Sequence, residues 1–193
     1  MIAVTVIVLF IPGTHSIQQL FPSANPYLSK AQMSSLFGSG GVYGVSVSAT
    51  TPAQVSTYLK NNPGFLPPSY TGGSGSVTGI WGAAYNSTIN VTSATFVTNL
   101  AIRLNTPASA DSFYAEALKQ TNQSSSAAVI NKSMNGALYS TLFINYSSNG
   151  RNSVMTMVLA KKGDEIGAVF AVSLNRSLTD LNSIINTLTS DLS

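Results

Sequence analysis

Residues 137–173 read ALYSTLFINYSSNGRNSVMTMVLAKKGDEIGAVFAVS. This segment contains three apolar stretches that are rich in β-branched and aromatic residues, which favour strands. They are separated by Asn149-Gly150 and by Lys162-Gly163-Asp164, sequences typical of tight turns between antiparallel strands. The segment therefore predicts a three-stranded antiparallel meander, with strands over residues 137–146, 153–160 and 166–173.

The rest of the chain predicts strands and helices that pack on this meander. Four helices are expected, because each candidate start carries a Ser or Thr suited to capping, in two cases followed by proline. Together these elements predict one α+β domain over residues 29–193, an antiparallel sheet of five or six strands with helices packed on one face. The further strands are expected over residues 42–47, 77–88 and 92–104, and the helices begin at Ser29, Thr51-Pro52, Thr106-Pro107 and Ser177.

Charged residues are unusually scarce. They make up 8% of the chain, against about 25% in ordinary soluble domains, and Ser, Thr and Asn take their place. No acidic residue precedes Asp111. Because few carboxylates are present to be protonated, we expect the stability of the fold to depend little on acid.

This composition resembles that of exported surface proteins of thermoacidophilic archaea. The resemblance extends over the whole chain, identifies no single family, and implies an extracellular or cell-surface location. A Ser/Thr-rich secreted domain from another source would have the same composition.

The first residues form an apolar run, MIAVTVIVLFI, that is broken only by Thr5 and ends at Pro12-Gly13. As a β-strand, the run would be apolar on both faces, and such a strand needs protein cover on both faces. The sheet of a neighbouring subunit can supply that cover when an extended segment completes it, and so can a sheet of the same chain. The residues that would form the assembly strand are Ile2, Val4, Val6, Val8 and Phe10, with Pro12 and Gly13 as the hinge.

Two other interpretations of residues 1–13 stay open. A signal peptide has such an apolar stretch, but this one lacks a basic start and a small-residue cleavage pattern. A membrane anchor is the other, although an eleven-residue helix extends only about 17 Å, short of a bilayer core of about 30 Å. Residues 14–28, which contain Pro22 and Pro26, are expected to form a linker.

The sequence offers few groups for catalysis. His15, the only histidine, lies in the expected linker, which argues against the common nucleophile–histidine arrangements. Because cysteine is absent as well, zinc sites built on several His or Cys ligands are excluded. Basic residues are scattered, unlike the clustered Lys and Arg of nucleic-acid-binding proteins. We therefore expect no enzyme activity, no cofactor, no metal and no nucleic-acid partner. Trp81, Tyr85 and Phe96 are expected to form either an aromatic ligand surface or part of the core.

Two functions fit these observations. The first is a structural subunit of a surface filament or layer, a homopolymer assembled by donating residues 2–11 to the next copy. The second is an exported or membrane-tethered ligand-binding or sensor-like module that uses a sheet face or the Gly/Ser-rich loop near residues 67–76.

The chain contains six Asn-x-Ser/Thr acceptor sequences, which suit glycan attachment in an exported protein. We expect glycans on the native protein at some of these positions. An intact mass equal to that of the unmodified chain would exclude this modification. The candidate residues are Asn86, Asn90, Asn122, Asn131, Asn145 and Asn175.

Overall fold

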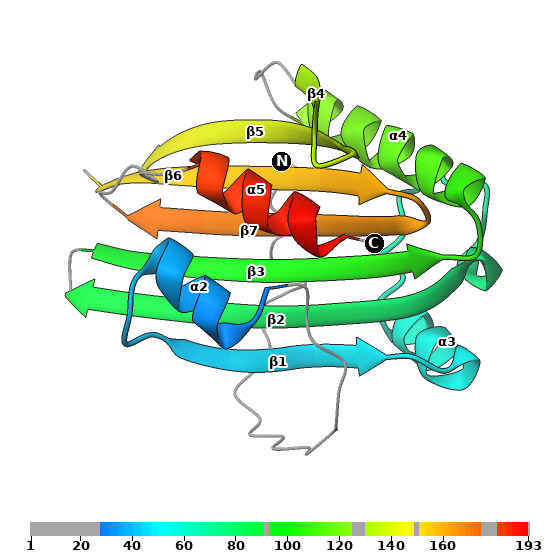
Figure 1. The fold of residues 1–193 in the computed structure, drawn as a ribbon, viewed down its shortest axis with the longest axis horizontal. Helices are drawn as coiled ribbons and strands as arrows, with labels where there is room; N and C mark the ends of the chain where they lie inside the picture. The colour runs from blue at the N-terminus through cyan, green and yellow to red at the C-terminus, as the bar shows by residue number, and fades with distance from the viewer. Residues whose placement is uncertain (1–27, 91–92, 125–129, 149–150, 175–180, 193) are drawn as a thin grey trace.

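A computed structural model describes residues 28–90, 93–124, 130–148, 151–174 and 181–192 (Figure 1). In this part of the chain, seven strands form one antiparallel sheet in the order β1-β2-β3-β7-β6-β5-β4. The strands are β1 (Val42–Ala49), β2 (Val77–Asn90), β3 (Ser93–Leu104), β4 (Ile130–Met134), β5 (Ala137–Ser148), β6 (Arg151–Lys162) and β7 (Glu165–Leu174). The helices are α2 (Lys30–Phe37), α3 (Pro52–Asn61), α4 (Pro107–Ser124) and α5 (Leu181–Asp191), with a short 3-10 turn η1 (Ser74–Ser76).

The structure confirms the α+β class and the meander expected from residues 137–173, which form β5, β6 and β7. The sheet has one strand more than the upper expectation. The additional strand, β4, contains the polar residues Asn131, Lys132 and Ser133 and so lacks the alternation that predicts strands. The sequence feature that indicates β4 is the Asn-Gly turn that follows it. Asn135 and Gly136 have φ values of 53° and 77°, the conformation for which two-residue hairpins favour Asn-Gly.

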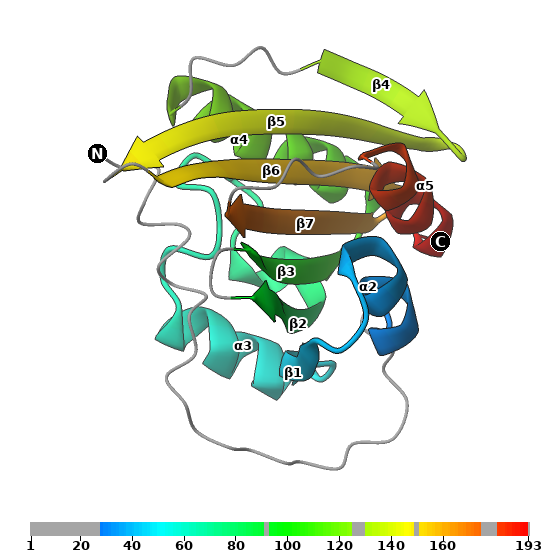
Figure 2. The same ribbon diagram turned by 90° about the vertical axis from the view of Figure 1, so that its left-hand side faces the viewer.

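One detail of the expected fold is corrected, because helices cover both faces of the sheet rather than one (Figure 2). One face packs against α2 and α5, through residues such as Met33 and Leu188. The other packs against α3 and α4, through residues such as Val55 and Phe113. We call these the α2/α5 face and the α3/α4 face.

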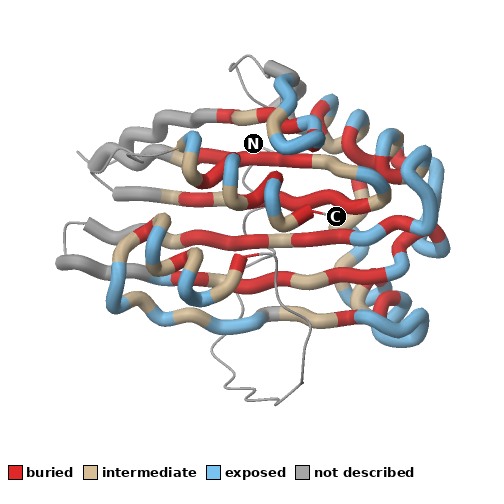
Figure 3. Tube along the Cα trace, in the orientation of Figure 1, coloured by how far each residue is buried: buried red, intermediate tan, exposed pale blue. Residues whose placement is uncertain are grey.

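The reason for two-sided packing lies in the central strands. In β7, Val169 and Ala171 belong to the core of the α2/α5 face, whereas Ile166 and Ala168 belong to the core of the α3/α4 face. Successive strand residues point to opposite faces, so an uninterrupted apolar strand needs cover on both sides. Figure 3 shows the result, with the buried residues concentrated along the central strands.

The expected starts of the first two helices are confirmed. Ser29 caps α2 and forms a capping box with Gln32, whose Oε1 accepts a hydrogen bond of 2.7 Å from the Ser29 backbone N–H. Thr51 caps α3 in the same way, with Pro52 in its first turn. Ser177, the expected cap of the last helix, lies outside the described residues. Leu28, placed in the linker by the sequence, is fully buried and belongs to the domain.

A side-chain contact joins α2, near the start of the described chain, to α5 at its end. The Nε2 group of Gln32 donates a hydrogen bond of 2.8 Å to Oδ2 of Asp191. Partial burial raises the pKa of Asp191 above its usual value, and the hydrogen bond from Gln32 opposes this rise. A raised pKa means that the native state binds this proton more tightly than the unfolded state does.

We expect this carboxyl group to favour the fold in acid. Its contribution to the free energy of unfolding is fully present below the ordinary aspartate value of 3.8 and is lost as pH rises through the raised native pKa. Asp191→Asn keeps an oxygen for Gln32 but cannot ionise, so its stability relative to the wild type should increase across that window. Urea unfolding at a series of pH values measures this difference. If the free energies of unfolding of the two proteins differed by the same amount at every pH, the expectation would be contradicted.

Candidate functional site

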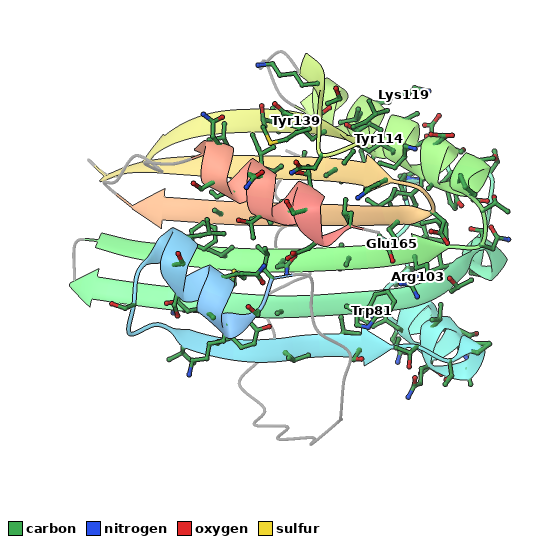
Figure 4. The ribbon with its side chains drawn as sticks, in the orientation of Figure 1. Trp81, Arg103, Tyr114, Lys119, Tyr139 and Glu165 are labelled. Carbon is green, nitrogen blue, oxygen red and sulfur yellow. The ribbon has the colours of Figure 1, made fainter. Side chains whose placement is uncertain are left out.

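A charged cluster lies on the α2/α5 face, where three adjacent strands bring Trp81, Arg103 and Glu165 together (Figure 4). Arg103 of β3 is directly opposite Gly79 of β2 on one side and Glu165 of β7 on the other. Trp81 is two residues beyond Gly79 and therefore points to the same face. The register of β2, β3 and β7 thus positions all three side chains.

The central contact of this cluster is an ion pair between Arg103 and Glu165. Nε and Nη2 of Arg103 donate hydrogen bonds of 3.0 and 2.5 Å to Oε1 of Glu165. The Glu165 side chain is 1% exposed and that of Arg103 is 47% exposed. A buried carboxylate needs such a partner because removal of a charge from water is costly. Glu165 directly follows the turn expected at Lys162-Gly163-Asp164 and is the first residue of β7.

Trp81 packs beside this ion pair. The guanidinium carbon of Arg103 lies 5.4 Å from the centre of the indole ring, within the range of a cation–π contact. The indole also lies over Gly79, where an added Cβ would come within 2.3 Å of Cη2 of Trp81. Glycine at this position therefore allows the ring to lie close to the sheet, next to the arginine.

This arrangement suits a structural ion pair better than catalysis. Glu165 is buried and held by Arg103, so its carboxylate is not presented to a substrate as a base would be. Among the described residues, no group of three or more His, Cys, Asp or Glu side chains could hold a metal ion. Within the same part of the chain, no helix has the length and apolar character needed to cross a membrane.

The structure separates the three aromatic residues singled out in the sequence. Tyr85 is fully buried, and its hydroxyl donates to the carbonyl oxygen of Gly38 and accepts a 3.2 Å hydrogen bond from the Gly41 backbone N–H. Trp81 is half-buried on the same face. Phe96 is half-buried and precedes Val97, which belongs to the core of the α2/α5 face. Because successive strand residues alternate, Phe96 points to the opposite face. The three do not form one surface.

The second candidate site is the outer edge of β1, which among the described strands ends the sheet opposite β4. Its sequence, VYGVSVSA, contains no charged residue. Val42 and Val45 are 76% and 54% exposed, the two most exposed large apolar residues of the described chain. Edge strands normally carry charged residues, proline or cover, because their unpaired backbone groups can pair with another strand. β1 has no charge or proline within its own sequence.

The predicted assembly strand and hinge, residues 2–13, lie outside the described residues, as does Asn175. Of the other candidate glycan acceptors, Asn86 is exposed but lies within β2, opposite Val42 of the edge strand. The backbones of the remaining four lie within regular elements rather than in loops. These are Asn90 in β2, Asn122 in α4, Asn131 in β4 and Asn145 in β5.

We expect Arg103→Ala to destabilise the domain because it leaves Glu165 buried without its cation. Breaking a fully buried pair costs about 3–5 kcal/mol, and we expect about 2 kcal/mol here because Arg103 is half exposed. Trp81 is the only tryptophan, so a change in its fluorescence should accompany the loss of stability. Arg103→Lys, which keeps the charge, is the control. Unfolding curves that coincide with the wild type for Arg103→Ala would contradict the role of the pair.

No protein-family model matches this chain, and no curated protein matches it. Among solved structures, the chain is similar to the extracellular domain of PknH from Mycobacterium tuberculosis, with a TM-score of 0.48 and 13% sequence identity. The superposition covers 89% of this chain and 96% of that domain.

Proposed function

We propose that this protein is an extracellular structural subunit that polymerises by donating residues 2–11, as a strand, to the sheet of a neighbouring copy. The observation that supports this most is the open sheet, whose edge strand β1 carries no charge and exposes two valines. Strand addition requires a free edge, because the backbone N–H and C=O groups along it supply the hydrogen bonds of the new pair.

Donation by one copy and acceptance by the next use two different surfaces of the subunit. Such head-to-tail contacts produce a ring only if a rotation closes them, and otherwise produce a filament or layer. Because Ser, Thr and Asn solvate much of the chain, like-charge repulsion between neighbouring copies would be weak. Glycans on the acceptor asparagines would add to the outer surface, and the native partners would be other copies of the chain.

A second candidate function is a non-catalytic ligand-binding module, exported or held at the membrane through its first residues. The observation that favours it is the exposed half of the Arg103 side chain beside Trp81. An arginine next to an aromatic ring offers both a charge and a flat apolar surface to a ligand. The native amino terminus distinguishes the two functions. A mature chain that begins after Gly13 would favour the binding module, because the donor strand would have been removed.

We expect variants with a disabled donor segment to remain monomeric. Deletion of residues 1–12 removes the strand, and the full-length double variant Val4→Asp/Val8→Asp keeps the chain length but places two charges on it. Burying an unpaired carboxylate against a sheet is strongly unfavourable, so both proteins should lose assembly. Electron microscopy and sedimentation of the purified proteins measure this. Assembly of the double variant and the deletion at the wild-type level would contradict the proposed function.

A further inference from the structure

We infer that the acceptor site for the donated strand is the free edge of β1, from Val42 to Val47, and that its occupant is residues 2–11 of a neighbouring copy. This inference rests on the proposed function and adds to it the surface at which the copies join. The sheet offers two edges in the described part of the chain, β1 and β4, and their properties differ in ways that bear on strand addition.

The β4 edge is protected in the manner usual for soluble proteins. It is only five residues long, and its Lys132 and Ser133 side chains are exposed. Short length and lysine are two of the features that prevent edge pairing. β1 is eight residues long and uncharged. The comparison therefore favours β1 as the edge at which another strand can add.

The apolar residues of β1 point to both faces of the sheet. Tyr43 and Val45 pair with Tyr85 and Ala83, whose side chains lie on the α2/α5 face. Val42 points to the α3/α4 face. A bulge between Val45 and Val47 shifts the alternation by one residue, so Val47 also points to the α3/α4 face, where it packs against the core.

Because β1 presents apolar side chains on both faces of the sheet, a strand that adds beside it should be apolar on both faces as well. A strand added beside β1 would place its alternate side chains next to Val45 on one face and next to Val42 and Val47 on the other. A strand with one polar face would bring that face against apolar neighbours. Residues 2–11 carry no charge and, apart from Thr5, are apolar on both faces, so their pattern matches this edge.

Neighbouring helices supply part of the cover that such a strand needs. α3 packs on β1 and β2 on one side of the sheet. On the other side, Tyr43 packs against the core that includes α2, and its hydroxyl donates a hydrogen bond of 3.1 Å to the Leu28 carbonyl oxygen. Figures 1 and 2 show both helices close to this edge of the sheet.

The same hydrogen bond places the start of the described chain beside β1. Residues 12–27 connect Leu28 to the donor segment, and sixteen residues span at most about 55 Å when extended. That length is enough to cross from one domain to the edge of the next. It would also reach the edge of the same domain, so the test below separates the two occupants.

The test uses two full-length variants that each lack one half of the contact. Val45→Lys places a charge on the β1 edge without disturbing the core, because Val45 is 54% exposed in the subunit. Val4→Asp/Val8→Asp disables the donor. We expect each variant alone to lose assembly. Mixed together, the intact donor of the first should bind the intact edge of the second and form a 1:1 complex, measured by sedimentation and by native mass spectrometry.

Matched controls separate an effect at this edge from a general effect of charge or folding. Val45→Thr keeps the β-branched shape and should assemble, and Ser133→Lys places the same charge on the β4 edge and should also assemble. Thermal unfolding checks that each variant is folded. If Val45→Lys does not fold, Val42→Lys replaces it, because Val42 is 76% exposed.

The outcomes distinguish failure of this inference from failure of the proposed function. If the wild type does not assemble, both the proposed function and the proposed acceptor site are wrong. If the wild type assembles, the donor variant does not, and folded Val45→Lys does, the function stands but the acceptor lies elsewhere. Loss of assembly in Ser133→Lys alone would assign the contact to β4. If Val45→Lys and Val4→Asp/Val8→Asp both fail to assemble and form no complex when mixed, residues 2–11 of one copy do not bind the β1 edge of another.

Discussion

The fold depends on a sheet whose central strands are apolar on both faces. Val158 and Leu159 are adjacent in β6, yet one packs into the core of the α2/α5 face and the other into the core of the α3/α4 face. Burial of one such side chain contributes about 1.5–3 kcal/mol. If either face were exposed to water, the stabilisation from many of these buried side chains would be lost, so the sheet needs helices on both sides. The helix pairs α2/α5 and α3/α4 follow from this requirement.

Among the described residues, two ion pairs connect different elements of the fold. Arg103 and Glu165 join β3 to β7, and Lys161 of β6 lies 2.8 Å from Asp111 of α4. These two contacts join elements that are distant in sequence, whereas a third ion pair, between Lys119 and Glu116, lies within α4. Burial raises the pKa of Asp191, so this carboxyl group favours the fold in acid.

The same sheet limits where a strand could add under the proposed function. Its two faces are covered by helices, so the surfaces left for a strand are the edges. β4 is short and carries a lysine, whereas β1 is longer, neutral and exposes Val42 and Val45. A protein that must stay monomeric usually protects such an edge. Within β1 itself, no charged residue or proline supplies that protection.

The sequence by itself determined the class of the fold, the meander of β5 to β7 and the caps of α2 and α3, because strand alternation, turn residues and caps act over a few neighbouring residues. It also identified the apolar run at residues 2–11. Only the tertiary structure decided that helices cover both faces, that Glu165 is buried against Arg103, and that Val42 and Val45 lie in an edge strand of the described sheet. These features depend on which strands become neighbours and in what register, and such long-range pairings leave no local pattern in the chain.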